Sequence, residues 1–399
     1  MSRLPAPQSR EELISLLTEA CELEHGLACS YLFTAFSLKQ RPIEGGLTTD
    51  QSHQVKYWAS QIFFVASQEM LHLAQAWNLL SAIGGTPYCL RPNLPQNSRY
   101  YPLHARVALE RFGERALKRF IVYETPAQAI LPWVRRQSAL SQSEVKRGHV
   151  TIGELYAAIA TGFNTIGDLF KGNVANQVDR RAVQFPDLIQ VRDSASALQA
   201  IHQITHQGEG TSADRADCHY GMFLGVLTEF KRERAVAGSG FQPVRQVLEN
   251  PVAQSANGYG AVAHPIKDPS TREAAQLFDA VYFLMLQALA FGFTPSADSA
   301  SATQVSAAAI ELMTTVLRPL GDALTTLPAG VEDLTGGPAF GLTRFVAFPA
   351  DSRLVIGLLR DRLNDLGRVA ARLAQALPAT PGLAVTAARL RDVAKRRTS

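Results

Sequence analysis

The sequence predicts a mainly α-helical protein built around a four-helix bundle. Apolar residues recur at steps of three and four over long segments, and alternation with a period of two is almost absent. Carboxylates interrupt the apolar stripes at positions that should face the bundle core. At 399 residues, the chain can bury a large core in one to three domains. We expect a bundle over residues 9–232 and a loop and helical C-terminal portion, 233–399, packed on it.

The first predicted helix starts at a capping box, Ser9 with Glu12, and runs to about Lys39, before Pro42. Its inward stripe contains Leu13, Leu17, Ala20, Glu24, Leu27 and Tyr31. Burying an ionised carboxylate without a partner costs several kcal/mol. Glu24 therefore needs a metal ion or a hydrogen-bond partner in the core.

The second predicted helix, about Asp50 to Ile83, contains the segment "QEMLHLAQAWNLLSAIGG", residues 68–85. Its inward stripe contains Ile62, Val65, Glu69, His72, Ala76, Leu79 and Ile83. Glu69 and His72 are three positions apart, so their Cβ atoms should lie roughly 5–6 Å from each other and both side chains could bind one ion. A buried glutamate that hydrogen-bonds to histidine or arginine is the alternative. Gly84 and Gly85 should end the helix.

The remaining elements follow from turn signals and helical periodicity. Residues 86–102 contain four prolines and should form an irregular crossing segment, followed by short helices at 103–122 and 126–140. A third long helix should run from Thr151 towards Phe170, and a fourth should open at Asp193, reach residue 210 and restart through "CHYGMF". Residues 234–268 should form a loop with short strands. Further helices are expected at about 271–292, 303–327, 351–377 and 380–396.

The bundle helices offer the ligands of a dinuclear metal site. In such bundles, two helices each supply a glutamate and two each supply a glutamate with a histidine. The candidates here are Glu24, Glu69, His72, Glu154, Glu209 and His219. Four carboxylates balance the charge of two divalent ions, whereas without metal several of them would have to take up protons. Oxygen-rich ligation with two imidazoles favours iron, with manganese as the alternative, over structural zinc.

Some of these candidates have a competing explanation. Glu154 follows Thr151 by three positions, so the pair could form a capping box, and Glu209 lies between two glycines where it could cap the next helix. His219 follows Glu209 by ten positions, so His202 or His206, in the pattern H-x-x-x-H-x-x-E, could replace it.

Other polar residues near the stripes are expected to have ordinary roles. Glu22 is off the inward stripe and should be solvated, and His25 is turned about 100° from Glu24, towards the surface or behind the metal ligands. Tyr31, Tyr123 and Tyr156 should be core residues. The four cysteines show no C-x-x-C spacing and should be small buried hydrophobes, not disulfides or zinc ligands.

Five segments together resemble the ferritin-like domain of iminophenyl-pyruvate dimer synthases of the violacein and rebeccamycin type and of stand-alone relatives. They are "LEHGLACSYL" (23–32), "QEMLHLAQAWNLLSAIGG", "TIGELYAAI" (151–159), "QGEG" (207–210) and "CHYGMF" (218–223). The segments "AIELMTTVLRPLGDALTTLPAG" and "TGGPAFGL" extend the resemblance over roughly residues 10–345. It implies a ferritin-like four-helix bundle with additional C-terminal helices, and it supports the wide spacing between Glu209 and His219. The full dimer synthases also include a region that resembles haem catalases; this chain lacks it, so no haem is expected.

Composition argues against several other classes of protein. The chain is 46% hydrophobic and 19% charged, and its net charge of +4 comes from scattered basic residues and an arginine-rich C-terminus. Basic residues do not alternate with aromatic ones in a patch, so we expect no nucleic-acid binding. No signal-type segment or run of roughly 18 uninterrupted apolar residues is found, so we expect a cytoplasmic protein without membrane contact; a homo-oligomer is compatible with the sequence.

The sequence therefore predicts a dinuclear iron oxidoreductase or oxygenase that acts with O₂ on a small organic, amino-acid-derived substrate in specialised metabolism. A ferroxidase or iron-handling protein and a non-enzymatic helical partner protein are the alternatives. The C-terminal helices and the crossing segment are expected to build a substrate pocket over one end of the bundle, with a volume of about 300 Å³ or more. Residues 346–399 lie outside the resemblance and have no predicted role.

Overall fold

The computed structural model describes residues 4–97, 106–126, 151–178, 183, 185–208, 216–254, 263–293, 298–342 and 346–397. In order, the elements are α1 (Arg10–Phe36), η1 (Pro42–Glu44), α2 (Thr49–Ala82), β1 (Gln96–Asn97), β2 (Arg106–Val107), α3 (Glu114–Tyr123), α6 (Ile152–Thr165), η3 (Val174–Asn176), α8 (Ser194–Gly208), α9 (His219–Ala237), η4 (Gly238–Gly240), β3 (Pro251–Val252), β4 (His264–Pro265), α10 (Pro269–Phe291), α11 (Ser299–Glu311), η5 (Leu312–Leu317), α12 (Arg318–Leu324), α13 (Ser352–Ala376) and α14 (Pro381–Arg397). The described part is mainly helical, as predicted.

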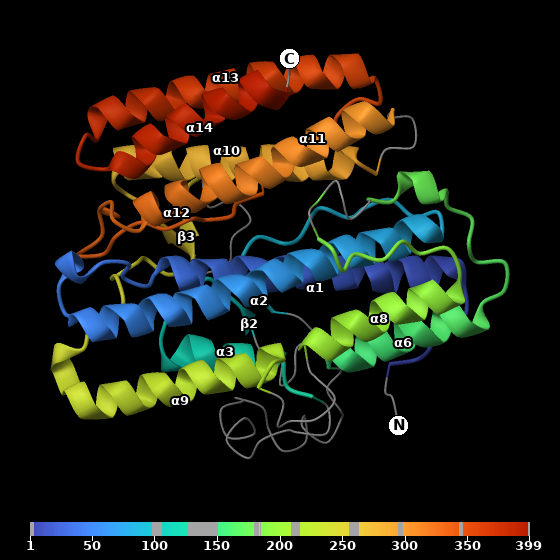
Figure 1. Ribbon diagram of the computed structural model, residues 1–399, viewed down its shortest axis with the longest axis horizontal. Helices are drawn as coiled ribbons and strands as arrows, with labels where there is room; N and C mark the ends of the chain where they lie inside the picture. The colour runs from blue at the N-terminus through green and yellow to red at the C-terminus, as the bar shows by residue number, and fades with distance from the viewer. Residues whose placement is uncertain are drawn as a thin grey trace.

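The two long helices α1 and α2 pack side by side through the middle of the molecule (Figure 1). Ser9 caps α1 by accepting a hydrogen bond from the Glu12 backbone N–H, but the predicted capping box is incomplete, because the Glu12 carboxylate accepts from the Gln8 N–H. A capping box of Thr48 and Gln51 starts α2. All residues of the two inward stripes predicted above are buried. The periodicity therefore identified the core face of both helices, including the carboxylates on it.

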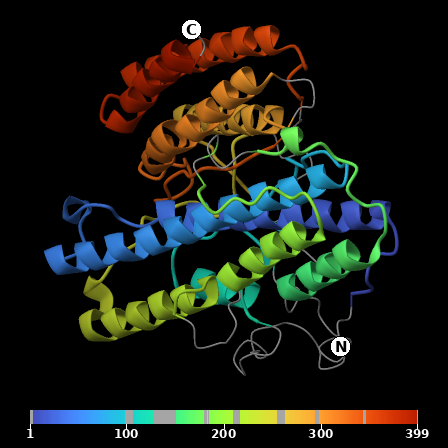
Figure 2. The same cartoon turned by 45° about the vertical axis from the view of Figure 1, so that its right-hand side comes forward.

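The other two helices of the bundle are each broken near the middle of the molecule. α3 and α6 follow one another, with residues 127–150, which the structure does not describe, between them, and α8 and α9 follow one another around residues 209–215. α3 packs against α9 and α6 against α8, so the bundle has two halves beneath α1 and α2 (Figures 1 and 2). The breaks place helix ends, with their side chains, at the centre of the bundle.

Helices α10 to α14 form a second group on the opposite side of the α1–α2 layer (Figure 2). Aspartates cap three of them: Asp268 for α10, Asp298 for α11 and Asp351 for α13. η5, a π-helical turn, joins α11 to α12 without a loop. α13 and α14 pack against each other as a pair at the outer edge.

Two short strand pairs and one close backbone contact hold the connecting segments in place. β1 pairs with β2 antiparallel, with Gln96 opposite Val107, and β3 pairs with β4 parallel, with Pro251 opposite His264. The backbone N–H of Gly172 donates to the Ala82 carbonyl oxygen at the end of α2. A Cβ atom at Gly172 would lie 1.6 Å from the Ser81 carbonyl oxygen, so only glycine fits there.

Several predicted boundaries need correction. α3 begins at Glu114, not near 103, because residues 106–107 are extended and pair with β1. α6 ends at Thr165, short of Phe170. The helix predicted at 126–140 falls mostly outside the described residues. In the described part, α10 is long and apolar enough to cross a membrane, but 67% of that stretch is buried inside the protein, as in a core helix.

Candidate metal centre

Five acidic and imidazole side chains meet where the broken helices face the α1–α2 layer. α1 supplies Glu24, α2 supplies Glu69 and His72, the residue after α3 is Glu124, and α9 begins with His219. Each of these residues is at most 3% exposed. We call these five residues the ligand cluster.

Glu69 lies at the centre of the ligand cluster and is shared by two groups of three. On one side, Glu69 Oε2 lies 3.3 Å from His72 Nδ1, which is 3.7 Å from Glu24 Oε2. On the other side, Glu69 Oε1 lies 2.8 Å from His219 Nδ1, which is 3.5 Å from Glu124 Oε2. The two imidazole rings are nearly parallel, with centroids 5.4 Å apart. Each half of the ligand cluster thus contains one histidine and one carboxylate of its own, and the two halves share Glu69.

Tyrosines hold the outer carboxylates of the two halves in equivalent ways. The Tyr156 hydroxyl donates a 2.5 Å hydrogen bond to Glu24 Oε1. The Tyr31 hydroxyl donates to Glu124 Oε1. In each glutamate, one oxygen is occupied by a phenol and the other, Oε2, faces the histidine of its half. Tyr31 and Tyr156 are buried core residues, as predicted, and they also orient carboxylates of the cluster.

Glutamines hold the two histidines in equivalent ways. His72 Nε2 lies 2.9 Å from Gln207 Oε1, and His219 Nε2 lies 3.1 Å from Gln68 Oε1. An amide oxygen can only accept, so each Nε2 carries the proton. In a neutral imidazole the lone pair is then on Nδ1, the nitrogen that faces Glu69. Each ring could therefore bind an ion through Nδ1 in its neutral form.

In the absence of metal, Glu24, His72 and His219 of the ligand cluster bind protons more strongly than such groups usually do. Burial and the neighbouring Glu69 raise the pKa of Glu24 to about 8. Burial opposes the charge of Glu69, but His219 and His72 outweigh it and lower the pKa of that carboxyl. Burial would likewise lower the pKa values of both histidines; nearby carboxylates instead raise that of His72 well above its usual value and that of His219 to about 9. At pH 7 the metal-free cluster therefore keeps Glu24 neutral and both imidazoles charged.

The donor atoms form two groups that could each hold a metal ion. Within each group of three, one ligand atom per residue lies within 4.8 Å of the others. Glu69 Oε1 and His219 Nδ1 are both buried and lie 2.8 Å apart, close enough for an ion pair but without the geometry of a hydrogen bond. A shared cation would satisfy both atoms. The described part thus offers two adjoining sites, each with one imidazole nitrogen and carboxylate oxygens.

The structure brings four of the six predicted ligands together: Glu24, Glu69, His72 and His219. Glu154 is not among them, because it forms the capping box at the start of α6: its carboxylate accepts from the Thr151 N–H, and its own N–H donates to the Thr151 hydroxyl. This was the alternative explanation of Glu154, and its role as a metal ligand stays a prediction.

The remaining candidates lie near the C-terminal end of α8. Glu209 lies outside the described residues and stays a predicted ligand; the preceding Gly208 is close to the cluster, since a Cβ there would lie 3.3 Å from Glu124 Oε2. His202 and His206 stack on each other with ring centroids 5.5 Å apart, and His202 is exposed. His219 thus occupies the position for which they were alternatives.

Glu124 was missed by sequence reasoning. It follows the apolar face of α3 directly, in "RFIVYETP", and is 3% exposed. A carboxylate at the end of an apolar helix, just before a proline, would ordinarily be assigned to a solvated helix end. Its position next to Tyr123, which was correctly expected in the core, was the feature of the sequence that could have indicated that Glu124 is buried.

Two cavities flank the α1–α2 layer on opposite faces. The first, of about 10 Å³, is lined by residues of the cluster and by Leu27, and is large enough for one ion or water molecule. The second, of about 380 Å³, lies between the layer and α10 to α12. The C-terminal helices line a pocket, but it lies on the face of the layer away from the ligand cluster, not over one end of the bundle, and the described residues of the crossing segment 86–102 do not line it.

The sequence was compared with known families and proteins. A family model described as Ferritin-like matches residues 17–228. The chain is 29% identical over 371 residues to a 2-imino-3-(indol-3-yl)propanoate dimerase of Chromobacterium violaceum, covering 84% of this chain and 35% of that protein. It is 30% identical over 385 residues to dichlorochromopyrrolate synthase of Lentzea aerocolonigenes, covering 85% and 37%. The chain thus spans little more than a third of the length of these curated relatives.

A solved structure supports the fold. The crystal structure of a ferritin-like protein from Caulobacter vibrioides superposes with a TM-score of 0.52 and 19% sequence identity. The match covers 86% of this chain and 100% of that chain. It therefore includes helices on both sides of the α1–α2 layer.

Proposed function

Because the chain belongs to the ferritin-like family, we propose that it is an oxidoreductase that uses a pair of iron ions and O₂ to oxidise a small organic molecule. The observation that carries this proposal is the position of Glu69, whose two oxygens face the two histidines of the ligand cluster. A carboxylate in that position can bridge two ions. Glu24 with His72, and Glu124 with His219, would then each hold one of them.

The donor set favours iron, with manganese as the alternative. Three carboxylates and two imidazoles form an oxygen-rich set, and none of the four cysteines is in the cluster. Glu209, if it joins the set, would bring the carboxylate charge to −4 and balance two divalent ions. Bound ferrous iron supplies the electrons for reducing O₂.

The residues around the cluster have defined tasks in this proposal. Tyr156 and Tyr31 hold the outer carboxylates, and Gln207 and Gln68 hold the Nε2 protons of the histidines. These contacts keep Nδ1 and Oε2 directed at the ions without rearrangement. Burial of the whole cluster excludes bulk water, which would otherwise compete for the ions.

The organic substrate is the part of the proposal that the relatives support. They are named as a dimerase of an indolyl imino acid and as a synthase of dichlorochromopyrrolate, both enzymes of biosynthesis. We propose for this chain a small, amino-acid-derived substrate in specialised metabolism. The dimerisation itself is not proposed, since the chain spans only 35% and 37% of those proteins.

A second candidate function is iron handling, in which iron itself is the substrate. It is favoured by the size of the cavity at the cluster, about 10 Å³ among the described residues, which suits an ion and not an organic molecule. In that case, the large cavity on the other face of the layer would have a separate role.

Oxygen consumption distinguishes the two candidates. The metal-free chain is given an excess of Fe(II) in aerated buffer, first alone and then with a reductant and amino-acid-derived imines generated in solution. The oxidoreductase should stop after oxidising the two ions it holds and resume when an organic substrate is added. An iron-handling protein would oxidise the excess without any organic molecule. Failure to bind iron at all would leave a non-enzymatic helical protein.

A further inference from the structure

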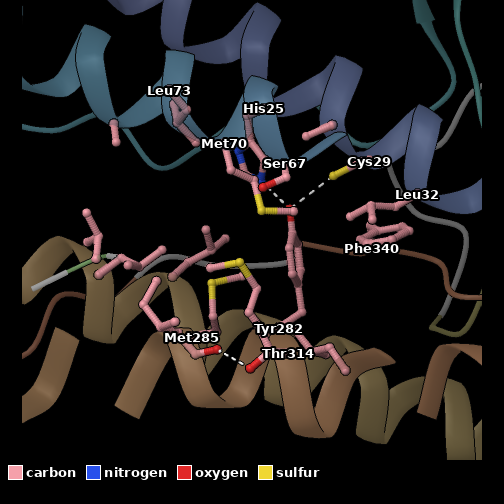
Figure 3. A pocket seen from close by; sticks show the side chains of 18 of the residues that line it. His25, Cys29, Leu32, Ser67, Met70, Leu73, Tyr282, Met285, Thr314 and Phe340 are labelled. Carbon is pink, nitrogen blue, oxygen red and sulfur yellow. Dashed lines mark hydrogen bonds between the residues drawn. The ribbon is translucent and has the colours of Figure 1, made fainter. Parts of the chain in front are cut away.

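The large cavity is enclosed by α1 and α2 on one side and by α10, α11, η5 and α12 on the other (Figure 3). From α1 it is lined by His25 and Cys29, whereas Glu24 and Leu27 line the cavity at the ligand cluster. From α2 it is lined by Met70, whereas Glu69 faces the ligand cluster. One helix layer therefore separates the two cavities, and a molecule in the larger one does not touch the candidate metal ligands.

The walls of this cavity are suited to a flat apolar molecule. Three of the chain's five methionines line it, together with aromatic rings of which Trp77 is the largest. Methionine side chains adapt to irregular shapes and pack favourably on aromatic rings. The volume of about 380 Å³ falls within the range of small-molecule sites, roughly 300–1,000 Å³. An empty void of this size would deprive its walls of packing contacts, so a packing defect is a poor explanation.

A polar chain reaches across the cavity from α1 to α10 (Figure 3). Arg91 Nη2 donates to Cys29 Sγ at 3.4 Å, and Cys29 Sγ lies 3.2 Å from the Tyr282 hydroxyl. The Tyr282 hydroxyl also hydrogen-bonds His25 Nε2 (Figure 3). All four residues are buried. His25 is thus buried and lines the large cavity, which contradicts the expectation that it lies at the surface or behind the metal ligands.

Either proton direction fits this chain, because either atom of the Cys29–Tyr282 contact can be the donor. We take the direction in which Cys29 accepts from Arg91 and donates its S–H to the Tyr282 oxygen. In that direction Tyr282 donates its single proton to His25 Nε2. A neutral imidazole with an acceptor nitrogen at Nε2 carries its proton on Nδ1. His25 Nδ1 is buried and has no hydrogen-bond partner, in a residue that is 3% exposed and lines the cavity.

We propose that this cavity is a binding site for an uncharged aromatic molecule carrying one hydrogen-bond acceptor, such as a ketone or ether oxygen, which accepts from His25 Nδ1. The aromatic body packs between the methionines of α2, α10 and η5. A buried donor without a partner is costly, so an acceptor on the ligand removes an existing deficit.

A path into the cavity exists on the side where α2 faces η5 and α12. Ser67, Thr314 and Arg318 line the cavity and are exposed, and Phe63 is partly exposed. The Arg318 guanidinium lies over the Phe63 ring, 4.7 Å from its centroid. A ligand would enter the cavity between these helices.

This site does not depend on the proposed metal chemistry. The metal-free chain should bind the ligand as well as the metal-loaded chain, because the ligand contacts a different face of the α1–α2 layer. A failure of metal binding would refute the proposed function but not this binding site. A failure of ligand binding would refute this binding site but not the proposed function.

Two matched probes test the site by titration calorimetry on the full chain. 2-Acetylnaphthalene carries one carbonyl acceptor, and 2-ethylnaphthalene has nearly the same shape without it. The ketone should bind about three- to tenfold more tightly, the usual worth of one hydrogen bond. Equal affinity of the two probes, or binding of neither, would overturn the proposal.

Variants locate the site and the donor. His25→Phe should reduce the affinity ratio of the two probes to about one while 2-ethylnaphthalene still binds, whereas His53→Phe, at an exposed histidine on α2, should leave the ratio unchanged. Ala28→Phe, which fills the cavity from α1, should weaken both probes. Should His25→Phe not fold, Tyr282→Phe provides the second test: without the hydroxyl the Nδ1 proton is no longer fixed, so the ratio should fall. A ratio that survives these changes refutes the assignment of His25 Nδ1.

Discussion

Replacing Glu69 by glutamine should remove both metal ions, whereas the same change at Glu24 or Glu124 should remove one. Glu69 Oε1 and Oε2 lie 2.8 Å and 3.3 Å from the Nδ1 atoms of His219 and His72. A glutamine cannot bridge two cations, and its amide group would direct a donor at one of the histidines. Every other member of the ligand cluster belongs to one half only.

The change should also destabilise the metal-free protein. Glu69 is the carboxylate closest to both imidazoles, and removing one partner of a buried ion pair costs about 3–5 kcal/mol. With an unfolding entropy of about 2.1 cal/mol/K per residue, a cooperative chain of 399 residues should lose roughly 4–6 °C in Tm. Two ions at a hundred times their Kd should add about 5 kcal/mol to the wild type, which is about 6 °C more. The variant should gain none of that increment.

Anaerobic calorimetry with and without Fe(II), together with metal analysis, measures both effects. Glu22→Gln is the matched control, because Glu22 is a partly buried carboxylate of α1 outside the ligand cluster. It should bind two ions and keep the thermal increment. If Glu69→Gln also bound two ions, the bridging role of Glu69 would be refuted.

Three further outcomes are expected. Glu124→Gln should retain one equivalent of iron by metal analysis, whereas Glu154→Gln should retain two and keep nearly the wild-type stability, because glutamine also completes a capping box; the opposite result would support Glu154 as a ligand. In thermal scans, Tm of the metal-free protein should fall as the pH rises from 6.5 to 9, because the raised pKa values of Glu24, about 8, and His219, about 9, mean that the folded state holds protons whose stabilisation is lost over that range. The metal-loaded protein should not show this fall. Gly172→Ala should lower the free energy of unfolding by about 1–3 kcal/mol, because the new Cβ would collide with a carbonyl oxygen of α2; an unchanged denaturation midpoint would show that the segment moves freely.

The sequence predicted the parts of the cluster that lie on continuous helices. Glu24, Glu69 and His72 each occupy the register of an apolar stripe in α1 or α2, so counting three- and four-residue steps was enough to place them in the core. The predicted ends of both helices lie within a few residues of the observed ends, because N-caps and glycines mark helix ends in the local sequence.

The sequence could not predict how the breaks in the other two helices bring side chains into the ligand cluster. Glu124 and His219 lie at the ends of α3 and α9, which meet only through tertiary packing. His219 was among the predicted ligands, but no stripe connects Glu124 to it, and Glu124 was missed. Glu154 had the composition and spacing of a ligand, but its carboxylate is engaged by the Thr151 backbone. His25 was misplaced because burial on the second face of α1 depends on α10 and its Tyr282, about 250 residues away in the sequence.

An anaerobic titration of the metal-free protein with Fe(II), followed by O₂, tests the proposed dinuclear site most directly when near-ultraviolet and visible absorption are recorded throughout. We expect saturation at two iron ions per chain and an absorption change on adding O₂ that is absent in Glu69→Gln. Saturation at one ion, or no binding, would contradict it and leave the five residues as a buried polar network of a structural bundle.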